Sequence, residues 1–308
     1  MDQERAEFVE RAMCINCGSP RLHTLSGGLF SEDPLRGFIE NDPWGVSPMP
    51  YIAHQRWCLV RCGDCAQMFH RNVLSPEWNG RRFSEWMTET AMRQFLAPSD
   101  TPAALFDQGR RHVAHIMRIE RLTRPLRAIQ AVSILDFGCG WGEFLAACEG
   151  FGFLCCGVDR SSARRLGAHV HIFADMEDLR EAPAAARGFH AITLFEVLEH
   201  LDDPLAVLRS LCDLLVPSGI LVLETPDCTG VSGIRTESDY RKTHPLDHIN
   251  AFTPATLRNI AVRAGFEPVG AGVAHVTSDR VQLVKTEMRR LLRPLLRPTT
   301  RQYFRKAR

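Results

Sequence analysis

Residues 132–142 carry a glycine-rich turn whose residue types and spacing suit cofactor binding. A short apolar run ends at Asp136, and the glycines that follow it are Gly138, Gly140 and Gly142. Glycine lets the backbone turn tightly and approach a ligand at the carboxyl end of a buried strand. A dinucleotide site would favour another glycine at position 143, where this chain has Glu143, whose charge repels phosphate but not a sulfonium. The turn therefore predicts a site for S-adenosylmethionine.

Further candidate cofactor-binding residues follow the later apolar runs. The run 153–158 ends at Asp159, about 20 residues past the glycines, where a carboxylate can accept hydrogen bonds from a ribose diol. The next segment offers a carboxylate and an apolar side chain that suit the edge and face of an adenine, at Asp175 and Met176. A fourth run, 189–195, leads into a segment rich in acids that contains His200.

The order of these motifs resembles the class I S-adenosylmethionine-dependent methyltransferases, especially the branch that modifies small molecules such as quinones and sugars. The resemblance runs from about Ile134 to Lys285, roughly half of the chain. It implies that Asp136 and the three glycines hold the methionine moiety and that Asp159 holds the ribose. It also implies that the adenine and the edge of the cofactor contact Asp175, Met176, Glu177, Phe195 and Glu196. Taken singly, each of these residues could equally be a helix cap or a loop carboxylate.

Three histidines are candidate general bases for the methyl acceptor: His248, His200 and His244. Imidazole titrates near neutrality, which suits removal of a proton from a hydroxyl or from an acidic carbon. In related sugar and quinone methyltransferases, a histidine before the Phe-Thr/Ser-Pro-x-x-Leu helix approaches the acceptor, so His248 ranks first. His200 ranks second, because the resemblance implies that Glu199 and His200 open the loop facing the substrate. Each histidine could instead cap a helix or stabilise a loop.

The sequence disfavours several macromolecular acceptors. The fourth run ends in Phe195-Glu-Val-Leu rather than the Asp/Asn-Pro-Pro-Tyr/Phe turn that handles base amines, and no Pro-Cys nucleophile appears. A small molecule remains as the partner, such as a glycan precursor, a quinone or a natural product, methylated on oxygen or carbon. Two alternatives stay open: an RNA-binding methyltransferase that uses the basic segments, and a non-catalytic cofactor-binding scaffold. A nicotinamide-dependent dehydrogenase is disfavoured by Glu143.

Four cysteines in two C-x-x-C pairs predict a structural zinc site: Cys14, Cys17, Cys62 and Cys65. Four thiolates from two such pairs can close a tetrahedral site with no open position, which gives the metal no catalytic role. The alternating run 55–61 should be the strand that feeds the second pair, and residues 26–50 read as an inserted loop. Cys58 or His54 could replace one ligand.

Composition limits the class of protein. The 308 residues include 37 Lys and Arg against 36 Asp and Glu, so no overall charge selects a polyanionic partner, and nucleic acid is not expected. The charged amino terminus does not resemble a signal sequence, and no apolar run reaches the ~18 residues that a membrane span needs. Several of the eleven cysteines fall in predicted buried segments, which favours a reducing cytoplasm over a disulfide framework.

The expected fold class is α/β, with a Rossmann-like, seven-stranded, mostly parallel sheet whose last strand is antiparallel. We expect four parts: a zinc-ribbon-like module at 1–75, a helical linker and lid at 76–130, the methyltransferase domain at 131–287 and a basic tail at 288–308. The last two strands are expected at 267–276 and 281–285, and a long helix at 102–129 should cover the cofactor pocket. The tail could lie on an anionic membrane surface through Leu291, Leu292, Leu295 and Leu296, or fray into solvent.

Overall fold

The computed structural model describes residues 4–88, 90, 91, 94, 101–126, 131–270, 272, 276, 284, 285, 288 and 299–307. The chain forms two compact units. Unit 1 contains Met1–Thr101, Leu198–Pro204 and Pro226–Ile260, and unit 2 contains Pro102–Val197, Leu205–Thr225 and Ala261–Arg308. These units differ from the expected domains, because two segments after residue 197 pack with the amino-terminal residues rather than with the large sheet.

Unit 2 is built on a seven-stranded sheet in the order β12-β13-β10-β9-β6-β7-β8. Its strands are β6 (Ser133–Phe137), β7 (Leu154–Val158), β8 (Ile172–Phe173), β9 (Phe189–Phe195), β10 (Leu215–Glu224), β12 (Phe266–Pro268) and β13 (Arg301–Lys306). The strands β6 to β10 pair in parallel, whereas β13 is antiparallel to both β10 and β12. The predicted mostly parallel sheet with an antiparallel final strand is confirmed.

The central strands of this sheet are almost continuously apolar because both of their faces are covered. Ile134 and Leu135 of β6, Ile192 of β9 and the run Ile220–Leu223 of β10 are fully buried. The order of the strands reverses at β6, whose neighbours are β7 on one side and β9 on the other. In open α/β sheets, ligands bind beyond the carboxyl ends of the strands at such a switch point.

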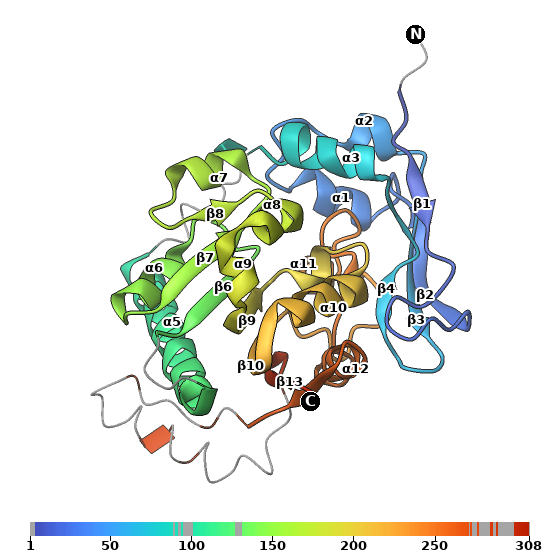
Figure 1. Cartoon of the computed structure of the whole chain (residues 1–308). Helices are drawn as coiled ribbons and strands as arrows, with labels where there is room; N and C mark the ends of the chain where they lie inside the picture. The colour runs from blue at the N-terminus through green and yellow to red at the C-terminus, as the bar shows by residue number, and fades with distance from the viewer. Residues whose placement is uncertain are drawn as a thin grey trace. The chain divides into compact units, whose positions relative to one another are not determined.

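The final strand lies in the segment that we expected to be a basic tail. Arg301–Lys306 forms β13 beside β10, as the red strand in Figure 1 shows, and the described residues 284 and 285 are helical rather than extended. The expectation that the last strand lies at 281–285 was therefore wrong, because that strand is β13. The strand expected at 267–276 overlaps β12. Tyr303 and Phe304 are buried, and their basic neighbours concealed this apolar signal in the sequence. The four leucines on which a membrane contact depended lie outside the described residues.

Helices of unit 2 connect and cover the strands. They are α5 (Pro102–Thr123), η3 (Arg124–Leu126), α6 (Glu143–Gly150), α7 (Ser162–Gly167), α8 (Met176–Glu181), α9 (Pro183–Arg187) and most of α10 (Pro204–Leu214), with the last part of α12 (Pro254–Arg263). The buried residues of α5 are His115, Ile116, Ile119 and Thr123, which recur at helical spacing on one face. That face packs against α6 and the central strands.

Unit 1 contains a four-stranded sheet in the order β11-β4-β3-β2 and a two-stranded sheet of β1 and β5. The strands are β1 (Phe8–Glu10), β2 (Leu22–Leu29), β3 (Arg56–Cys62), β4 (Met68–His70), β5 (Asn72–Leu74) and β11 (Asn250–Ala251). The helices are α1 (Leu35–Glu40), α2 (Met49–Ile52), α3 (Pro76–Arg81), η1 (Arg82–Trp86), η4 (Leu198–His200) and α11 (Glu237–Lys242). Pairing of β11 with β4 adds a late segment to the amino-terminal ribbon.

The region expected to be an inserted loop is partly helical. Phe30, Leu35 and Ile39 are fully buried in an aromatic core that also contains Trp78 and Trp86. Residues 26–50 are therefore part of the fold of unit 1 and not a free excursion. No helix in the described part of the chain is both long and apolar enough to cross a bilayer.

Candidate functional site

The glycine-rich turn lies at the switch point, between the end of β6 and the start of α6. Gly138, Gly140 and Gly142 have φ values of +78°, +58° and +77°, a region that favours glycine. A Cβ at Gly138 would lie 2.5 Å from Val197 Cγ2, whereas a Cβ at Gly140 would meet no atom within 4 Å. The turn is thus packed on its inner side and open at Gly140, a cradle that fits a cofactor approaching the backbone.

Two carboxylates brace this turn. Asp136 is buried at the end of β6, and its Oδ1 accepts a hydrogen bond from Thr193 Oγ1 of β9 at 2.6 Å. Burial raises the pKa of Asp136 to about 7, and the nearby charge of Asp159 adds to this effect. Asp159 accepts hydrogen bonds from the backbone N–H of Gly140 at 3.0 Å and of Ser161 at 2.9 Å. Since a carboxylate has about four lone-pair sites, Asp159 keeps acceptor capacity for a ligand hydroxyl.

The remaining predicted cofactor residues lie at the ends of β8 and β9. Asp175 is the N-cap of α8 and accepts hydrogen bonds from the N–H groups of Glu177 and Asp178, both at 2.9 Å. Met176 is the first residue of α8 and is partly exposed, and Glu177 is exposed. At the end of β9, the Phe195 ring packs against Phe144 and His115, with ring centroids 5.0 and 4.7 Å away.

Glu196 has an unusual backbone conformation. It is a non-glycine residue with φ +53°, and its N–H donates to Glu224 O at 2.8 Å. Strained backbone of this kind clusters at functional sites, where the surrounding structure holds it in place. The turn after β9 is therefore a second ordered feature at the switch point, and the sequence contained no signal for its conformation.

A polar network that we did not predict connects β10, β13 and α5. Arg301 donates to the Glu224 carboxylate through two nitrogens, and His115 Nε2 lies 3.2 Å from Glu224 Oε2. Burial lowers the pKa of His115, so the ring is neutral at pH 7, donates from Nε2 and accepts the Tyr303 hydroxyl at Nδ1 over 2.6 Å. Burial alone would raise the pKa of Glu224, but the hydrogen bonds from His115 and Arg301 lower it to about 2.

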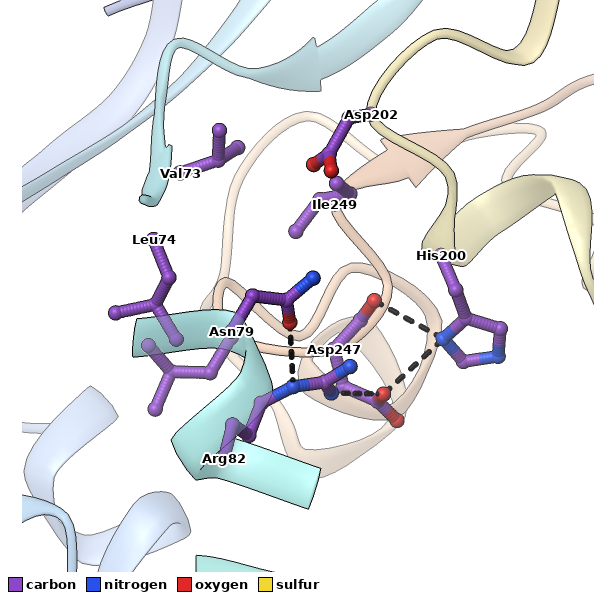
Figure 2. Close-up of a pocket in the computed structure, with 9 residues that line it drawn as sticks. Val73, Leu74, Asn79, Arg82, His200, Asp202, Asp247 and Ile249 are labelled. Atoms are coloured by element: carbon purple, nitrogen blue, oxygen red, sulfur yellow. Dashed lines mark hydrogen bonds and ion pairs between the residues drawn. The ribbon is translucent and has the colours of Figure 1, made fainter. Parts of the chain in front are cut away.

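Unit 1 brings two of the three candidate histidines together. The rings of His200 and His248 have centroids 4.9 Å apart, and His200 Nδ1 lies 3.0 Å from Asp247 Oδ1. Figure 2 shows Asp247 between His200 and Arg82, which forms an ion pair with the same carboxylate and donates to Asn79. A small pocket beside them is lined by Val73, Leu74, Asn79, Arg82, His200, Asp202, Leu246, Asp247 and Ile249.

These two histidines have opposite electrostatic environments. Burial would lower the pKa of His200, but the carboxylate of Asp247 outweighs it and raises the pKa to about 9. For His248 burial prevails and lowers the pKa to about 4, because Asp247 Oδ2 is 3.8 Å away. Burial would raise the pKa of Asp247 itself, yet His200 and Arg82 hold it well below its ordinary value. At pH 7 the pair therefore consists of one imidazolium and one neutral imidazole.

His244 has a different environment. It is buried, and its Nε2 lies 2.8 Å from the Tyr240 hydroxyl and 2.9 Å from Asp42 Oδ2. Tyr240 and Arg241 also contact the Asp42 carboxylate. This network joins the segment after α1 to α11, so its contacts are those of a residue that stabilises unit 1.

Within the part of the chain that the structure describes, two groups of side chains have the spacing of metal ligands. The ligand atoms of Glu199, His200 and His248 lie within 4.8 Å of one another, and so do the four sulfurs of Cys14, Cys17, Cys62 and Cys65. Cys14 Sγ is 3.5 Å from Cys65 Sγ, and Cys17 Sγ is 3.5 Å from Cys62 Sγ. Zinc–sulfur bonds of about 2.3 Å in a tetrahedron place sulfurs about 3.8 Å apart, which this group matches closely.

The two cysteine pairs have the same local geometry. Backbone N–H groups donate to sulfur at 3.4 Å in both, from Asn16 to Cys14 and from Asp64 to Cys62. The residue after each pair has positive φ, +72° at Gly18 and +62° at Ala66. Such N–H···S bonds stabilise thiolates, so the donor set fits a zinc ion.

A protein-family model described as "Methyltransferase domain" matches residues 81–270, which is more than half of the chain. The chain belongs to this family. The predicted resemblance to class I S-adenosylmethionine-dependent methyltransferases is thereby confirmed, and the glycine-rich turn lies within the matched range.

Individual curated relatives share less than a third of their aligned residues with this chain. It is 30% identical over 126 residues to the ubiquinone biosynthesis O-methyltransferase of Haemophilus ducreyi, covering 37% of this chain and 53% of the relative. It is 31% identical over 154 residues to the enzyme of that name from Psychrobacter arcticus, covering 43% and 58%. The chain thus spans little more than half the length of these relatives. Among solved structures, the plantazolicin methyltransferase BpumL, in complex with a desmethylPZN analog and SAH, aligns with 14% identity over 75% of this chain and 95% of that one, with a TM-score of 0.47.

Proposed function

We propose that this protein transfers a methyl group from S-adenosylmethionine to a hydroxyl oxygen of a small, phenol-like molecule in the cytoplasm. The proposal depends on one observation: His200, held by Asp247, lies beside His248 in a chain whose large sheet has the methyltransferase glycine turn. The relatives are named for O-methylation in ubiquinone biosynthesis, which favours a quinol-type acceptor. Carbon methylation and the glycan and natural-product acceptors are less favoured by those names.

The cofactor side of the reaction would use the switch point of unit 2. Asp136, Gly138, Gly140 and Gly142 would hold the methionine moiety, Asp159 the ribose, and Asp175, Met176, Glu177, Phe195 and Glu196 the adenine and the cofactor edge. S-adenosylmethionine supplies an already activated methyl group, so the main task of the protein is to align the acceptor oxygen with it. The open face of Gly140 and the free acceptor capacity of Asp159 support this assignment.

The acceptor side would use the histidine pair of unit 1. A general base must be unprotonated, and His248 is the neutral member of the pair at pH 7, although a pKa of about 4 makes it a weak base. The imidazolium of His200 would donate a hydrogen bond to the acceptor oxygen as negative charge develops on it. Neighbouring titratable groups whose environments separate their pKa values commonly divide acid and base roles in this way. His244, in its Asp42 network, would have no part in the transfer.

We also propose that Cys14, Cys17, Cys62 and Cys65 hold a structural zinc ion. A site with four protein ligands has no open position, so the metal would stabilise the ribbon of unit 1 and take no part in methyl transfer. The geometry of the four sulfurs and their two N–H donors supports this assignment.

A labelled methyl donor tests the main proposal. The chain would be incubated with radiolabelled S-adenosylmethionine and a panel of catechols and hydroquinones, including 3,4-dihydroxybenzoate. The assay would be run without chelator, with EDTA, and with magnesium added back after EDTA. Transfer to a phenolic oxygen, lost in His248→Ala while S-adenosylhomocysteine still binds, is expected. The EDTA arm shows whether Glu199, His200 and His248 act with a divalent cation. Absence of S-adenosylhomocysteine binding in calorimetry, or salt-sensitive RNA binding with transfer to RNA, would refute the proposal.

A further inference from the structure

The η4 turn carries Glu199 and His200, and two arginines from the first 82 residues reach it through one intermediate residue each. We propose that Asn250 and Asp247 are positioning residues for His200, with Arg11 holding Asn250 against the η4 backbone and Arg82 holding Asp247 against the His200 ring. This inference rests on the proposed role of His200 at the acceptor and gives the amino-terminal ribbon a part in building that site.

The first connection acts on the backbone of η4. Asn250, which is 1% exposed, donates from its amide nitrogen to Leu198 O at 2.9 Å and to Leu201 O at 2.7 Å. These two carbonyls flank Glu199 and His200 on either side. A turn of three residues leaves most of its carbonyls without helical partners, so a side-chain donor is needed to hold it. Both amide hydrogens of Asn250 are used for this purpose.

Arg11 fixes the orientation of that amide. Its Nη1 donates to Asn250 Oδ1 at 2.8 Å, while Nη2 donates to Ile249 O at 2.8 Å and Nε donates to His70 O at 2.9 Å. With the guanidinium on its oxygen, the amide can only present its nitrogen to η4. The same guanidinium holds β4 and the start of β11 together, so the amide is anchored to the four-stranded sheet.

The second connection acts on the imidazole. His200 Nδ1 lies 3.0 Å from Asp247 Oδ1 and 3.1 Å from Asp247 O, so one residue contacts the same ring nitrogen twice. Arg82, which is 1% exposed, forms an ion pair with Asp247 and donates from Nε to Asn79 Oδ1 at 3.0 Å. Figure 2 shows this series of contacts from α3 and η1 to the ring. Because the arginine planar fork is rigid and bonds two partners, it restricts the direction of the carboxylate.

The two connections restrain different degrees of freedom of the same residue. Asn250 fixes where the backbone of His200 lies, and Asp247 fixes the plane in which its ring lies. Transfer to an acceptor oxygen depends on alignment, and a displacement of about 1 Å can reduce the rate about a hundredfold. Arg11 precedes the first cysteine pair and Arg82 lies in η1, so both connections begin in the first 82 residues and give them a part in positioning His200.

Asn250→Asp tests the first connection with minimal change in shape. The carboxylate keeps an oxygen for Arg11 but replaces the two amide donors by an oxygen that faces Leu198 O and Leu201 O. Its matched control is Asn72→Asp, where the half-buried amide donates to a single carbonyl, Arg56 O, at 3.2 Å in an exposed hydrogen bond. Should Asn250→Asp fail to fold, Asn250→Ser removes the same donors without adding charge.

Arg82→Lys tests the second connection. It keeps the charge beside Asp247 but loses the fork that also bonds Asn79. Its matched control is the adjacent Arg81→Lys, whose side chain pairs with the exposed Glu4 and Glu85.

Three measurements are made on each full-length variant: hydrogen exchange in peptides that cover η4, binding of S-adenosylhomocysteine, and turnover of the best acceptor in the panel. We expect Asn250→Asp to speed exchange in η4 at least tenfold, since two hydrogen bonds are lost. Turnover should fall about tenfold or more in Asn250→Asp and Arg82→Lys, with the dissociation constant of S-adenosylhomocysteine changed less than twofold. Both controls should behave as the wild type.

Unchanged exchange in η4 of Asn250→Asp would overturn the inference, and so would faster exchange with unchanged turnover. Equal losses in the controls would overturn it as well, because they would indicate a general effect of the substitution. If the wild type binds S-adenosylhomocysteine but methylates no acceptor in the panel, the proposed function fails while the exchange data still decide whether Asn250 holds η4.

Discussion

Replacement of Glu224 by Gln should destabilise the sheet of unit 2 in a pH-dependent way. The side chain is 22% exposed and receives hydrogen bonds from Arg301 on β13 and His115 on α5. Its pKa falls from 4.5 to about 2 in the folded protein. Since one pKa unit corresponds to about 1.4 kcal/mol, the ionised carboxylate stabilises the fold by about 3 kcal/mol.

The pH range follows from the direction of this shift. A carboxyl whose folded pKa is depressed contributes its full stability above its unfolded value of 4.5 and loses that contribution as pH falls towards about 2. Glu224→Gln lacks the charge at every pH. The difference in unfolding free energy between wild type and variant should therefore be largest at neutral pH and should shrink below pH 4.5.

Urea unfolding followed by circular dichroism across this pH range measures that difference. Glu149→Gln serves as the control, because Glu149 is exposed on α6 and its replacement should change stability by less than about 0.5 kcal/mol. A cost below about 1 kcal/mol for Glu224→Gln at neutral pH would refute the reasoning, as would a difference that stays constant on acidification. Either result would also weaken the view that the Glu224 network holds β13 to the sheet.

Three further outcomes are expected. Elemental analysis should find one zinc ion per chain. Cys62→Ser should remove the zinc and unfold the ribbon of unit 1, because a structural zinc ion supplies folding free energy. A variant that stays folded without metal would contradict this prediction. Asp159→Ala should weaken S-adenosylhomocysteine binding at least tenfold in calorimetry, because it removes the hydrogen bond from Gly140 and the proposed charge-assisted hydrogen bonds from the ribose. Unaltered affinity would contradict the assignment of Asp159 to the ribose. His244→Ala should lower the free energy of unfolding by about 2 kcal/mol, since it removes a buried ring that contacts both Asp42 and the Tyr240 hydroxyl. Cofactor affinity should stay unchanged, and a loss of turnover with full stability would make His244 a site residue instead.

The features that were predictable from the sequence have local signals. The glycine turn, the carboxylates at strand ends and the two cysteine pairs are short patterns in which every residue is near its neighbours in the chain. The parallel strands are continuous apolar runs because both faces of the sheet are buried. These signals led to the correct fold class and family, and to the cysteine group that the structure assembles.

The features that escaped prediction depend on partners far apart in the chain. β11 has only two residues, and its pairing with Phe69 and Met68 crosses about 180 residues, so no window of sequence reveals it. β13 was hidden because its basic residues suggested a solvated tail, although Arg301 pairs with Glu224 and Lys306 donates to Leu215 O at 2.9 Å. A charged residue in a sheet is uninformative until its partner is known.

The histidines show the same limit at the level of a single contact. In the sequence Asp247 is adjacent to His248, which suggests that the carboxylate serves that histidine. In the structure it approaches His200 at 3.0 Å, from 47 residues away, and stays 3.8 Å from His248 Nε2. A carboxylate that raises the proton affinity of one imidazole leaves its neighbour to be governed by burial, so the two rings separate into a proton holder and a proton acceptor. The arrangement of Asp247, and not the identity of the histidines, sets which of the two rings is protonated at pH 7.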